Sequence, residues 1–467
     1  MSDHNVLDYQ AVADGLADDA PALQRAIDAA HAAGGGRVVV PAGSRVRAGS
    51  FELRSRVELH VARGAVLVSA TTLEAFPRRV FDSGDEADKR LWIGASHAED
   101  ITLSGTGVID GQCHAFALGQ NEHIYTPTLK WRPALTCFED VRRLVVRDLT
   151  FRNAANWTLH FTGCQDVSVH DVKIFNDLRF PNADGIDPDH CQRVNIARCH
   201  IVSADDCIVL KNTAQFTRYG PCEDIDVSDC RLESVSAAFK IGSESHGDFR
   251  RIRVRDCVIE RSHRGLAFQL RDGGSVEDVE FRNITVNTRR FAPVFWGAGE
   301  ALYVTALARL PGGPVSELHN IRFHDIRCSG ENGVVIYSQV PGRIHDVLLE
   351  RVHVEILRTT PWPSGLLDLR PCPPGYLPPG ASPADVSTPW GQPALRPPSM
   401  FSVEGATHVE LREVTATAST RDDFSWAWLT ADHPTRGQVL DSSTGQIPPR
   451  PSPFSASLDP ASLTPSS

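Results

Sequence analysis

The sequence lacks the features that mark membrane proteins and nucleic-acid-binding proteins. No apolar run approaches the ~20 residues that a membrane-spanning helix needs. No run of lysine and arginine is long enough to follow a phosphate backbone, and the net charge of −11 opposes such binding. We therefore expect neither nucleic acid nor a membrane as a partner.

A secretion signal and paired metal-binding cysteines are also missing. The N-terminus has neither the basic n-region nor the apolar h-region of a signal peptide. The 11 cysteines form an odd number and include no CxxC pair of the kind found in zinc and redox sites. Both absences favour a cytoplasmic protein whose thiols are reduced and mostly buried. We expect no metal and no other cofactor.

The first predicted element is a short helix near the N-terminus. Asp18 and Asp19 offer N-cap and first-turn carboxylates, and Pro21 stands where its missing N–H does no harm. Glycines 34–36 end the helix. Its apolar face consists of Leu23, Ala26, Ile27 and Ala30. Strands are predicted next, over Arg37–Pro41, Val57–Val61 and Ala65–Val68.

A short phrase then recurs from about residue 100 onward. It has two apolar residues at i and i+2, usually Asp, Asn or Arg at i+4, and then an apolar residue or cysteine. Nine copies begin at Leu144, Val167, Val194, Ile225, Ile252, Val279, Ile321, Val347 and Val409. Their starts are 23, 27, 31, 27, 27, 42, 26 and 62 residues apart. Short alternating strands at a period near 27, without helical spacing between them, predict an all-β parallel solenoid with loops of varied length.

The repeat also predicts where three cysteines lie and how far the solenoid extends. Cys199, Cys230 and Cys257 share one register in successive coils, which predicts a stack inside the solenoid. The Pro- and Gly-rich stretch Pro361–Met400 reads as a wrapped loop or lid. We expect one domain over residues 1–430 and an extended or disordered tail over 431–467, which is rich in Pro and Ser at 445–467.

Three carboxylates stand out from the ordinary surface charge. Asp184 precedes Gly and Ile in the way that Asp206 precedes Cys and Ile, 22 residues later, and Asp205 lies beside Asp206. If 22 residues make one coil, the three acids meet, and their mutual repulsion raises the pKa of at least one. Glycoside cleavage uses such a set, because one group protonates the leaving oxygen while another activates water or attacks carbon. Inversion needs carboxyl groups ~6.5–9.5 Å apart.

Two other interpretations of these acids stay open. Asp is common at solenoid turns, where its side chain bonds exposed backbone, and Asp187 and Asp189 nearby fit that role. Clustered aspartates also suit a calcium ion.

These motifs resemble those of glycoside hydrolase family 28, the polygalacturonases and their relatives. The segment Asn182–Asp187 resembles the family's NTDG(I/F)D motif, and Ser203–Ile208 with Lys211 resembles its DDC motif as found in exo-acting members. The opening stretch Asp14–Gly43 resembles the N-terminal cap of pectin-active β-helices. The resemblance covers roughly residues 5–430 and implies a right-handed parallel β-helix.

The resemblance also implies roles for the three aspartates. Asp205 would be the general acid, and Asp184 with Asp206 would hold and deprotonate the water, giving inversion. The expected activity is therefore exo-acting hydrolysis of a glycosidic bond in a pectin-related or other oligosaccharide.

Two further family motifs are altered in this chain. Residues 235–237 read Val-Ser-Ala where the family has Gly-His-Gly, and His246, ten residues after Ser236, replaces that histidine only in part. Residues 267–269 read Ala-Phe-Gln where the family has Arg-Ile-Lys. The cations that grip the substrate carboxylate are thus missing, so a substrate other than unmodified galacturonan is expected.

Strand alternation indicates which side chains replace them. Lys240, Gln269 and Arg271 should point outward, and a 27-residue step should stack Lys240 on Ala267 and Glu244 on Arg271. We hypothesise that Lys240 and Arg271 supply the cationic groups. The alternative is an exposed lysine beside a lateral Glu244–Arg271 ion pair.

A loop further on offers a second set of substrate contacts. Trp296 could stack on a sugar with Glu300 as a hydroxyl acceptor, or Trp296 could anchor the loop. His190, His263 and the other histidines show no metal spacing, and most are expected at the surface. The loops Phe291–Pro314 and Pro361–Met400 could close one end of the cleft.

Two rival functions remain at this stage. One is a polysaccharide lyase on the same scaffold, which needs a neutralising cation and a Lys or Arg base. The other is a carbohydrate-binding β-helix without catalysis. The sequence leaves the sugar, the linkage and the oligomeric state open.

Overall fold

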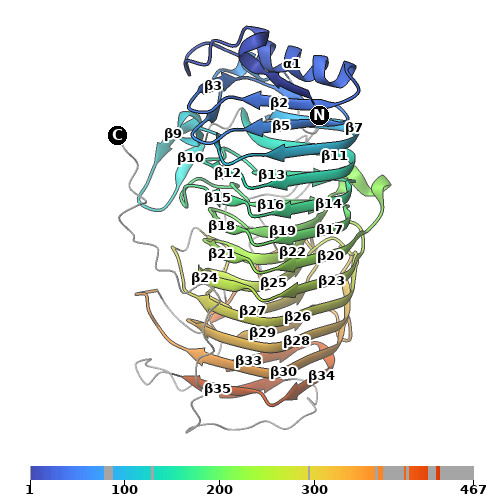
Figure 1. Ribbon diagram of the computed structural model, residues 1–467. Coiled ribbons are helices and arrows are strands. Elements are labelled where there is room, and N and C mark those ends of the chain that lie inside the picture. Colours follow the sequence, from blue (N-terminus) through green and yellow to red (C-terminus); the bar gives the residue numbers. More distant parts are fainter. Residues whose placement is uncertain are drawn as a thin grey trace.

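The computed structural model describes residues 2–77, 88–127, 131–292, 295–362, 366–371, 394–395, 399–418 and 427–431. These residues form a parallel β-helix whose coils stack along one long axis, with the N-terminal coils at the top of Figure 1. One 32-stranded sheet winds through the described part of the chain, and each strand pairs in parallel with the strand one coil later. The predicted all-β solenoid is confirmed.

Each coil contributes to three faces, which we call A, B and C. Face A contains β4 (Phe51–Glu52), β7 (Asp88–Ser104), β11 (Trp131–Arg147), β13 (Leu159–Thr162), β16 (Ile186–Asp189), β19 (Ile208–Asn212), β22 (Ala237–Ser245), β25 (Arg264–Leu270), β27 (Leu302–Ala306), β29 (Val334–Ser338), β33 (Ser399–Glu404) and β36 (Ala427–Ala431). Face B contains β1 (Ser2–Asn5), β2 (Gly36–Val40), β5 (Val57–Val61), part of β7 and β11, β14 (Gln165–His170), β17 (Gln192–Ala197), β20 (Cys222–Ser228), β23 (Phe249–Arg255), β26 (Ser275–Thr288), β28 (Glu317–Gly330), β30 (Ile344–Ile356) and β34 (Ala406–Arg412). Face C contains β3 (Arg45–Ala48), β6 (Val66–Ser69), β8 (Val108–Asp110), β12 (Thr150–Arg152), β15 (Lys173–Phe175), β18 (His200–Ser203), β21 (Arg231–Ser234), β24 (Val258–Ser262), part of β26, β28 and β30, and β35 (Thr415–Ala418).

The remaining elements cap or flank the stack. The helix α1 (Ala20–Ala32) covers its N-terminal end, and two antiparallel pairs stand outside the coils. These pairs are β9 (Ala117–Gln120) with β10 (Tyr125–Pro127), and β31 (Leu366–Leu367) with β32 (Ala394–Leu395). Short 3₁₀ helices occur at η1 (Val6–Tyr9), η2 (Leu73–Ala75), η3 (Cys113–Phe116) and η4 (Ala214–Tyr219).

The nine copies of the repeated phrase lie one above another on face B. Each copy pairs with the next, from Leu144 with Val167 through to Val347 with Val409, so all eight intervals are confirmed. The residue at i+4 has a positive φ in every copy, for example 58° at Asp171 and 54° at Asn283. Asp and Asn tolerate this left-handed conformation better than most residues, which explains their frequency at the corner between faces B and C.

The interior is a single apolar column that includes the predicted cysteine stack. The ten described cysteines are free and buried, and the thiol of Cys230 contacts those of Cys199 and Cys257. Phenylalanines form a second stack, with the ring of Phe281 5.0 Å from Phe323, 5.6 Å from Phe239 and 5.8 Å from Phe268. The described helices include none long and apolar enough to cross a membrane.

The predicted helix and early strands are found with small changes. The helix buries its predicted face, and Val57–Val61 is β5 as expected. Asp19 does not cap the helix with its side chain; its carboxylate accepts hydrogen bonds from the N–H groups of Val12 and Ala13 instead. The reason is its backbone conformation (φ −87°, ψ 4°), which is outside the extended region of an N-cap. Within Pro361–Met400, residues 361–362, 366–371, 394–395 and 399–400 are described. Of the predicted tail at 431–467, Ala431 ends β36, and residues 432–467 lie outside the described residues.

Replacing Phe281 should separate the effect of volume from that of aromaticity. Phe281→Ala should lower the free energy of unfolding by about 3–5 kcal/mol, because it leaves a cavity among three other rings. Phe281→Leu should lower it by less than about 1.5 kcal/mol, since other coils have aliphatic residues at this register. Urea denaturation measures both values, with the neighbouring exposed Arg282→Ala as control. Equal losses in the alanine and leucine variants would contradict the packing argument.

Candidate active site

The three aspartates lie at the corner where face C turns into face A. The expected 22-residue coil is confirmed, because Ile186 pairs with Ile208 and Asp189 with Lys211. The peptide N–H of Gly185 donates to the carbonyl oxygen of Asp206, which ties the two corners together. A Cβ atom on Gly185 would lie 2.3 Å from the carbonyl oxygen of Cys207, so the coils approach this closely only with glycine there.

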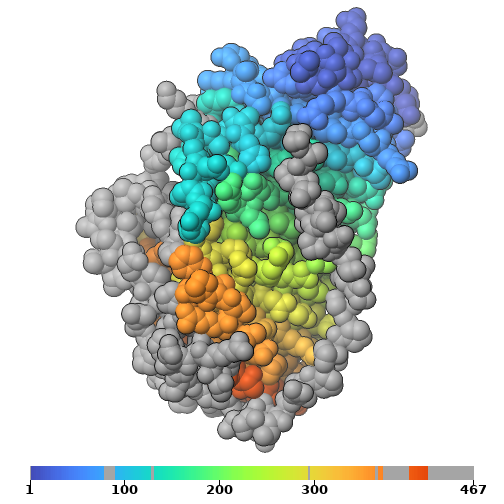
Figure 2. All heavy atoms as spheres, turned by 90° about the vertical axis from the view of Figure 1, so that its left-hand side faces the viewer, coloured from blue at the N-terminus to red at the C-terminus, as the bar shows by residue number. Residues whose placement is uncertain are grey.

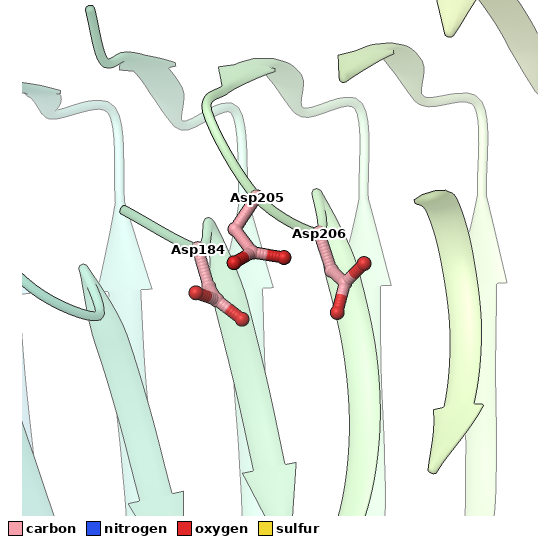
Figure 3. Close-up of side chains that lie close together, drawn as sticks. All are labelled: Asp184, Asp205 and Asp206. Atoms are coloured by element: carbon pink, nitrogen blue, oxygen red, sulfur yellow. The ribbon is translucent and has the colours of Figure 1, made fainter. Parts of the chain in front are cut away.

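The three carboxylates gather at one point, as Figure 3 shows. One oxygen each from Asp184, Asp205 and Asp206 lies within 4.8 Å of the others. Asp184 and Asp206 are only 2% and 1% exposed, and Asp205 is half-buried. These oxygens are closer than the ~6.5–9.5 Å between carboxyl groups expected for inversion. Distance therefore does not by itself distinguish inversion from retention here.

Asp206 has hydrogen-bond donors on both of its oxygens. Its Oδ1 accepts from the hydroxyl of Ser236 at 2.8 Å and from the N–H of Ala237 at 3.1 Å. Its Oδ2 accepts from the ammonium group of Lys240. Three donors, one of them charged, therefore hold the Asp206 carboxyl group in one orientation.

Asp205 and Asp184 have weaker support and tend to keep a proton. The Nδ2 of Asn182 lies 3.5 Å from Oδ2 of Asp205. Burial, and then the charge of Asp206, raises the pKa of Asp205 to about 6, although Lys240 and Lys211 oppose the shift. Burial, and then Asp205 and Asp187, raises the pKa of Asp184 well above its usual range.

A fourth acid and a lysine complete the cluster. Lys211 Nζ lies 3.8 Å from Asp184, 3.7 Å from Asp187 and 3.7 Å from Glu244, and 4.7 Å from the ring centre of Trp157. Burial raises the pKa of Asp187 to about 8, against the lowering effect of Lys211. Burial alone would lower the pKa of Lys211, but Glu244, Asp184 and Asp187 raise it well above its usual range.

Sequence reasoning placed Lys211 and Glu244 near the aspartates but missed three of their neighbours. Asp187 had been assigned a turn or supporting role, although strand alternation puts it on the outer surface of face A with the other polar groups. Ser236 and Trp157 carried no pattern that pointed to the site. Ser236 reaches Asp206 from the next coil, and Trp157 contacts Lys211 from two coils away.

Lys240 points outward and stacks on Ala267 as predicted, but its ammonium group binds Asp206. The predicted stacking of Glu244 on Arg271 is wrong. The described register ends at Ser243 with Leu270, and Glu244 lies against Lys211. The guanidinium group of Arg271 donates instead to the Leu270 carbonyl and, at 3.1 Å, to the Thr305 hydroxyl.

Two nitrogens of Arg271, Nε and Nη2, have no hydrogen-bond partner among the described residues, although the side chain is fully buried. Within the same part of the chain, the buried Gln269 leaves its Nε2 without a partner. Burial lowers the pKa of Arg271, and the positive charges of Arg264 and Arg309 lower it further, against the raising effect of Tyr303.

The loop with Trp296 lies against these cations. Its ring centre is 5.6 Å from Lys240 Nζ and 5.8 Å from the guanidinium carbons of both Arg264 and Arg271. Glu300 is completely buried and bonds to Arg264 at 3.2 Å. Its Oε2 holds a buried arginine, while its Oε1 has no hydrogen-bond partner among the described residues, so its role as a hydroxyl acceptor stays a prediction.

The histidine predictions need correction. His190 and His263 are buried, not at the surface, because each lies at a coil corner where its ring bonds backbone carbonyls. Burial lowers the pKa of His263 to about 3. His246 is partly exposed and lies 3.7 Å from Asp272, so it does not occupy the place of a histidine among the three aspartates.

A segment from the Pro-rich stretch covers face A beyond Lys240. Leu367 and Leu369 pack with Ala237, Ala267, Tyr303, Leu307 and Val335 in a second apolar cluster outside the coils. Asp368, fully buried, holds this segment through Arg264 at 3.3 Å, Arg370 at 2.7 Å and the N–H of Gly297 at 2.9 Å. Part of the predicted lid is thus a fixed wall over Ala267.

A second wall stands on the side of face C. At the tip of the β9–β10 hairpin, the ring centre of His123 lies 6.0 Å from that of Trp362. In Figure 2 the teal hairpin projects beside the green coils that carry the aspartates and reaches the orange segment. Residues far apart in sequence thereby meet across the coils of the site.

The same cluster has the donors that a metal ion would use, since three carboxylate oxygens lie within 4.8 Å. Lys240 already bonds to Asp206, and Lys211 lies 3.8 Å from Asp184. These ammonium groups supply the positive charge that a cation would bring, so we assign no metal to the site.

Comparison with known proteins agrees with this geometry. The family model described as Glycosyl hydrolases family 28 matches residues 44–355. A probable polygalacturonase of Vitis vinifera is 28% identical over 315 residues, which cover 63% of this chain and 62% of that protein. An exopolygalacturonase of Platanus acerifolia is 25% identical over 255 residues, 52% of this chain and 64% of that protein. The chain thus spans less than two thirds of the length of these curated relatives.

Solved structures show the same fold. The exopolygalacturonase of Thermotoga maritima superimposes with a TM-score of 0.64 at 22% identity, covering 76% of this chain and 87% of that one. The family 28 exopolygalacturonase of Yersinia enterocolitica gives a TM-score of 0.69 at 17% identity, covering 94% of this chain and 78% of that one. At these identities the likeness concerns the fold alone.

The raised pKa of Asp187 predicts a characteristic dependence of stability on pH. Its native value of about 8 exceeds the ~3.9 of an unfolded aspartate, so the native state keeps a proton that the unfolded state loses. The resulting stability is complete below pH ~4 and is lost as the pH rises through 8. Melting temperatures from pH 4 to 9 should therefore fall more in the native protein than in Asp187→Asn.

The control for this experiment is Asp171→Asn. Hydrogen bonds from Arg198 and His170 lower the pKa of Asp171 to about 2, so its contribution is lost only as the pH falls toward 2. This variant should leave the slope between pH 5 and 8 unchanged. Parallel curves for the native protein and Asp187→Asn would contradict the assignment.

Proposed function

Because the chain belongs to glycosyl hydrolases family 28, we propose that it hydrolyses O-glycosidic bonds with the three aspartates of the corner. Asp205 donates a proton to the leaving oxygen, Asp184 and Asp206 hold the attacking water, and Asp206 takes the proton of that water. The observation that carries the proposal is the gathering of the three carboxylates within 4.8 Å, in a setting that gives them different protonation.

The roles follow from the environments of the three groups. The match to the family's DDC motif assigns Asp205 as the proton donor, and its pKa of about 6 keeps part of it protonated near neutral pH. Asp206 receives three hydrogen bonds that fix its orientation, which suits a group that orients water. Asp184 has an oxygen, Oδ1, without a hydrogen-bond partner, and this oxygen is available to a water molecule.

Inversion is the proposed stereochemical course. It rests on the match of the two aspartate motifs to the family pattern. A water held by two carboxylates, with the acid beside them, gives direct displacement without a covalent sugar intermediate.

We propose that the enzyme acts from a chain end. Leu367 and Leu369 cover Ala267, Tyr303 and Val335, so a long polymer cannot continue along face A past Lys240. The buried ion pairs of Asp368 hold this wall in place. Relatives named exopolygalacturonases support the same mode of action.

The proposed substrate is a pectin-related oligosaccharide with an acidic sugar. Lys211 lies among carboxylates of the protein, and Lys240 and Arg264 pair directly with them, so these three are not available to a substrate carboxylate. Arg271 has two unpaired donors, and Gln269 has another beside it. A buried guanidinium without a counter-ion is costly, and a substrate carboxylate would remove that cost.

A lyase reaction fits this site poorly. A lysine that abstracts a proton must be neutral, which requires a lowered pKa. The carboxylates around Lys211 raise its pKa well above the usual range. Hydrolysis by paired carboxyl groups is therefore the better explanation, and the choice between catalysis and binding alone depends on the experiment below.

Asp205→Asn should distinguish the acid from the water-activating pair. On an oligosaccharide its kcat should fall by about 10²–10⁴-fold, because the leaving oxygen then departs without a proton. On a nitrophenyl glycoside of the same sugar it should fall far less, since nitrophenolate leaves unprotonated. Asp184→Asn and Asp206→Asn should lower kcat on both substrates, with Asp171→Asn as control.

Equal losses of kcat on both substrates in Asp205→Asn would contradict its role as acid. Absence of turnover by the native protein on a broad glycoside panel would favour binding alone.

Digestion of end-labelled oligosaccharides should show the mode of attack and the stereochemistry. A panel of acidic and neutral pectic oligomers of three to six sugars should lose one terminal unit at a time, because the wall over Ala267 admits only a chain end. Proton NMR of the fresh product should show the anomer opposite to that of the bond cleaved. Products of random length would overturn end action, and a retained anomer would overturn inversion.

A further inference from the structure

We propose that Lys240 is a positioning residue that holds the carboxylate of Asp206 together with Ser236, and that it does not bind the substrate. The inference rests on the proposed hydrolase function and assigns a residue outside the three aspartates to the reaction. It replaces the sequence-based hypothesis that Lys240 grips a substrate carboxylate.

The contacts come from one short segment of the next coil. Ser236 Oγ and the N–H of Ala237 donate to one oxygen of Asp206, and Lys240 Nζ donates to the other. Lys240 pairs in register with Val209 and is 5% exposed. The ring of Trp296 lies on another side of its ammonium group, 5.6 Å away. The ammonium group is thus enclosed between an acid and an indole ring.

Asp206 and Lys240 act in opposite directions on the titration of Asp205. Three donors fix the position of the Asp206 carboxylate, and its charge is the largest cause, after burial, of the raised pKa of Asp205. The positive charge of Lys240 partly offsets that rise. Lys240 thus controls both the direction of the Asp206 carboxylate and the pH at which Asp205 loses its proton.

Other charged groups around Asp205 act on the same titration. They are Asp184 and Asp187 from the preceding coil, Asp206 beside it, and Lys211 from β19. Glu244 acts indirectly, since it lies 3.7 Å from Lys211. Of these groups, only Asp206 bonds to Lys240, so a substitution at position 240 acts on Asp205 through the lost charge and through Asp206.

The composition of the chain is consistent with a specific use of lysine here. The 467 residues include 47 basic residues, of which only five are lysines, at positions 89, 130, 173, 211 and 240. Two of the five meet the aspartates. A lysine presents a compact charge that can approach one carboxylate oxygen, whereas the fork of arginine favours two.

The test compares Lys240→Met, Lys240→Arg and Ser236→Ala, with the exposed Lys173→Met on face C as control. In Lys240→Met we expect kcat to fall by about 10²-fold with KM changed less than about twofold. The basic limb of the pH–rate profile, near pH 6 in the native protein, should move to higher pH because Lys240 no longer lowers the pKa of Asp205. Lys240→Arg should restore part of kcat and return the limb toward its native position, and Ser236→Ala should lower kcat by a smaller factor.

Arg271→Gln should change the kinetic parameters in the opposite way to Lys240→Met. As the proposed substrate contact, it should raise KM for acidic oligosaccharides and leave the basic limb in place. If Lys240→Met behaved in that way, with higher KM, native kcat and an unmoved limb, the proposal would be overturned.

A titration without substrate keeps the test independent of turnover. Carboxyl ¹³C NMR of aspartate-labelled protein, assigned by difference with Asp205→Asn, should show a higher pKa of Asp205 in Lys240→Met than in the native protein. An unchanged pKa of Asp205 would refute the role of Lys240, whether or not the protein hydrolyses a sugar. Absence of hydrolysis on all the sugars tried would refute the proposed function instead. Should Lys240→Met fail to fold, the same titration of Lys240→Gln takes its place, since glutamine keeps a polar side chain at this position and removes only the charge that lowers the pKa of Asp205.

Discussion

Hydrogen bonding between each coil and the next, in parallel and in register, fixes the position of nearly every side chain in this protein. A coil may be longer or shorter only at its corners, because its strands must meet the strands of the coil before it. The 22-residue coil between Asp184 and Asp206 is such a case. Its ends align at Ile186 with Ile208, and this alignment brings acids from two coils to one corner. The chemistry of the site is thus a consequence of coil length.

Four acids lie close together in a buried corner, so positive charges nearby must offset their negative charges. Lys211 lies between Asp184, Asp187 and Glu244, and Lys240 bonds to Asp206. Compensation is incomplete, as the raised pKa values of Asp187 and Asp205 show. Burial, together with the repulsion that remains among the acids, keeps a proton in the cluster at neutral pH. A site that must deliver a proton to a leaving group benefits from this imbalance.

The repeat allowed much of this architecture to be predicted, and its limits are equally physical. Strand alternation and a fixed period placed Lys240 above Ala267 and brought Asp184 to Asp206, because both rules act between neighbouring residues or neighbouring coils. They could not tell whether the long side chain of Lys240 would extend to the substrate or turn to Asp206. The bond between Arg264 and Asp368, 104 residues apart, was beyond prediction because the inserted segment does not share the repeat. The bond between Glu300 and Arg264 was beyond prediction for the same reason.

The helix α1 has a consequence that concerns the molecule as a whole. A stack of parallel coils ends in strands whose peptide groups are free to bond to another chain, and such an edge invites end-to-end growth into fibres. In Figure 1 the helix lies over the first coils, with Leu23, Ala26 and Ile27 buried against them. It closes the top of the column with an element that cannot add a strand. The amphipathic helix thereby gives an otherwise open-ended repeat a defined N-terminal boundary.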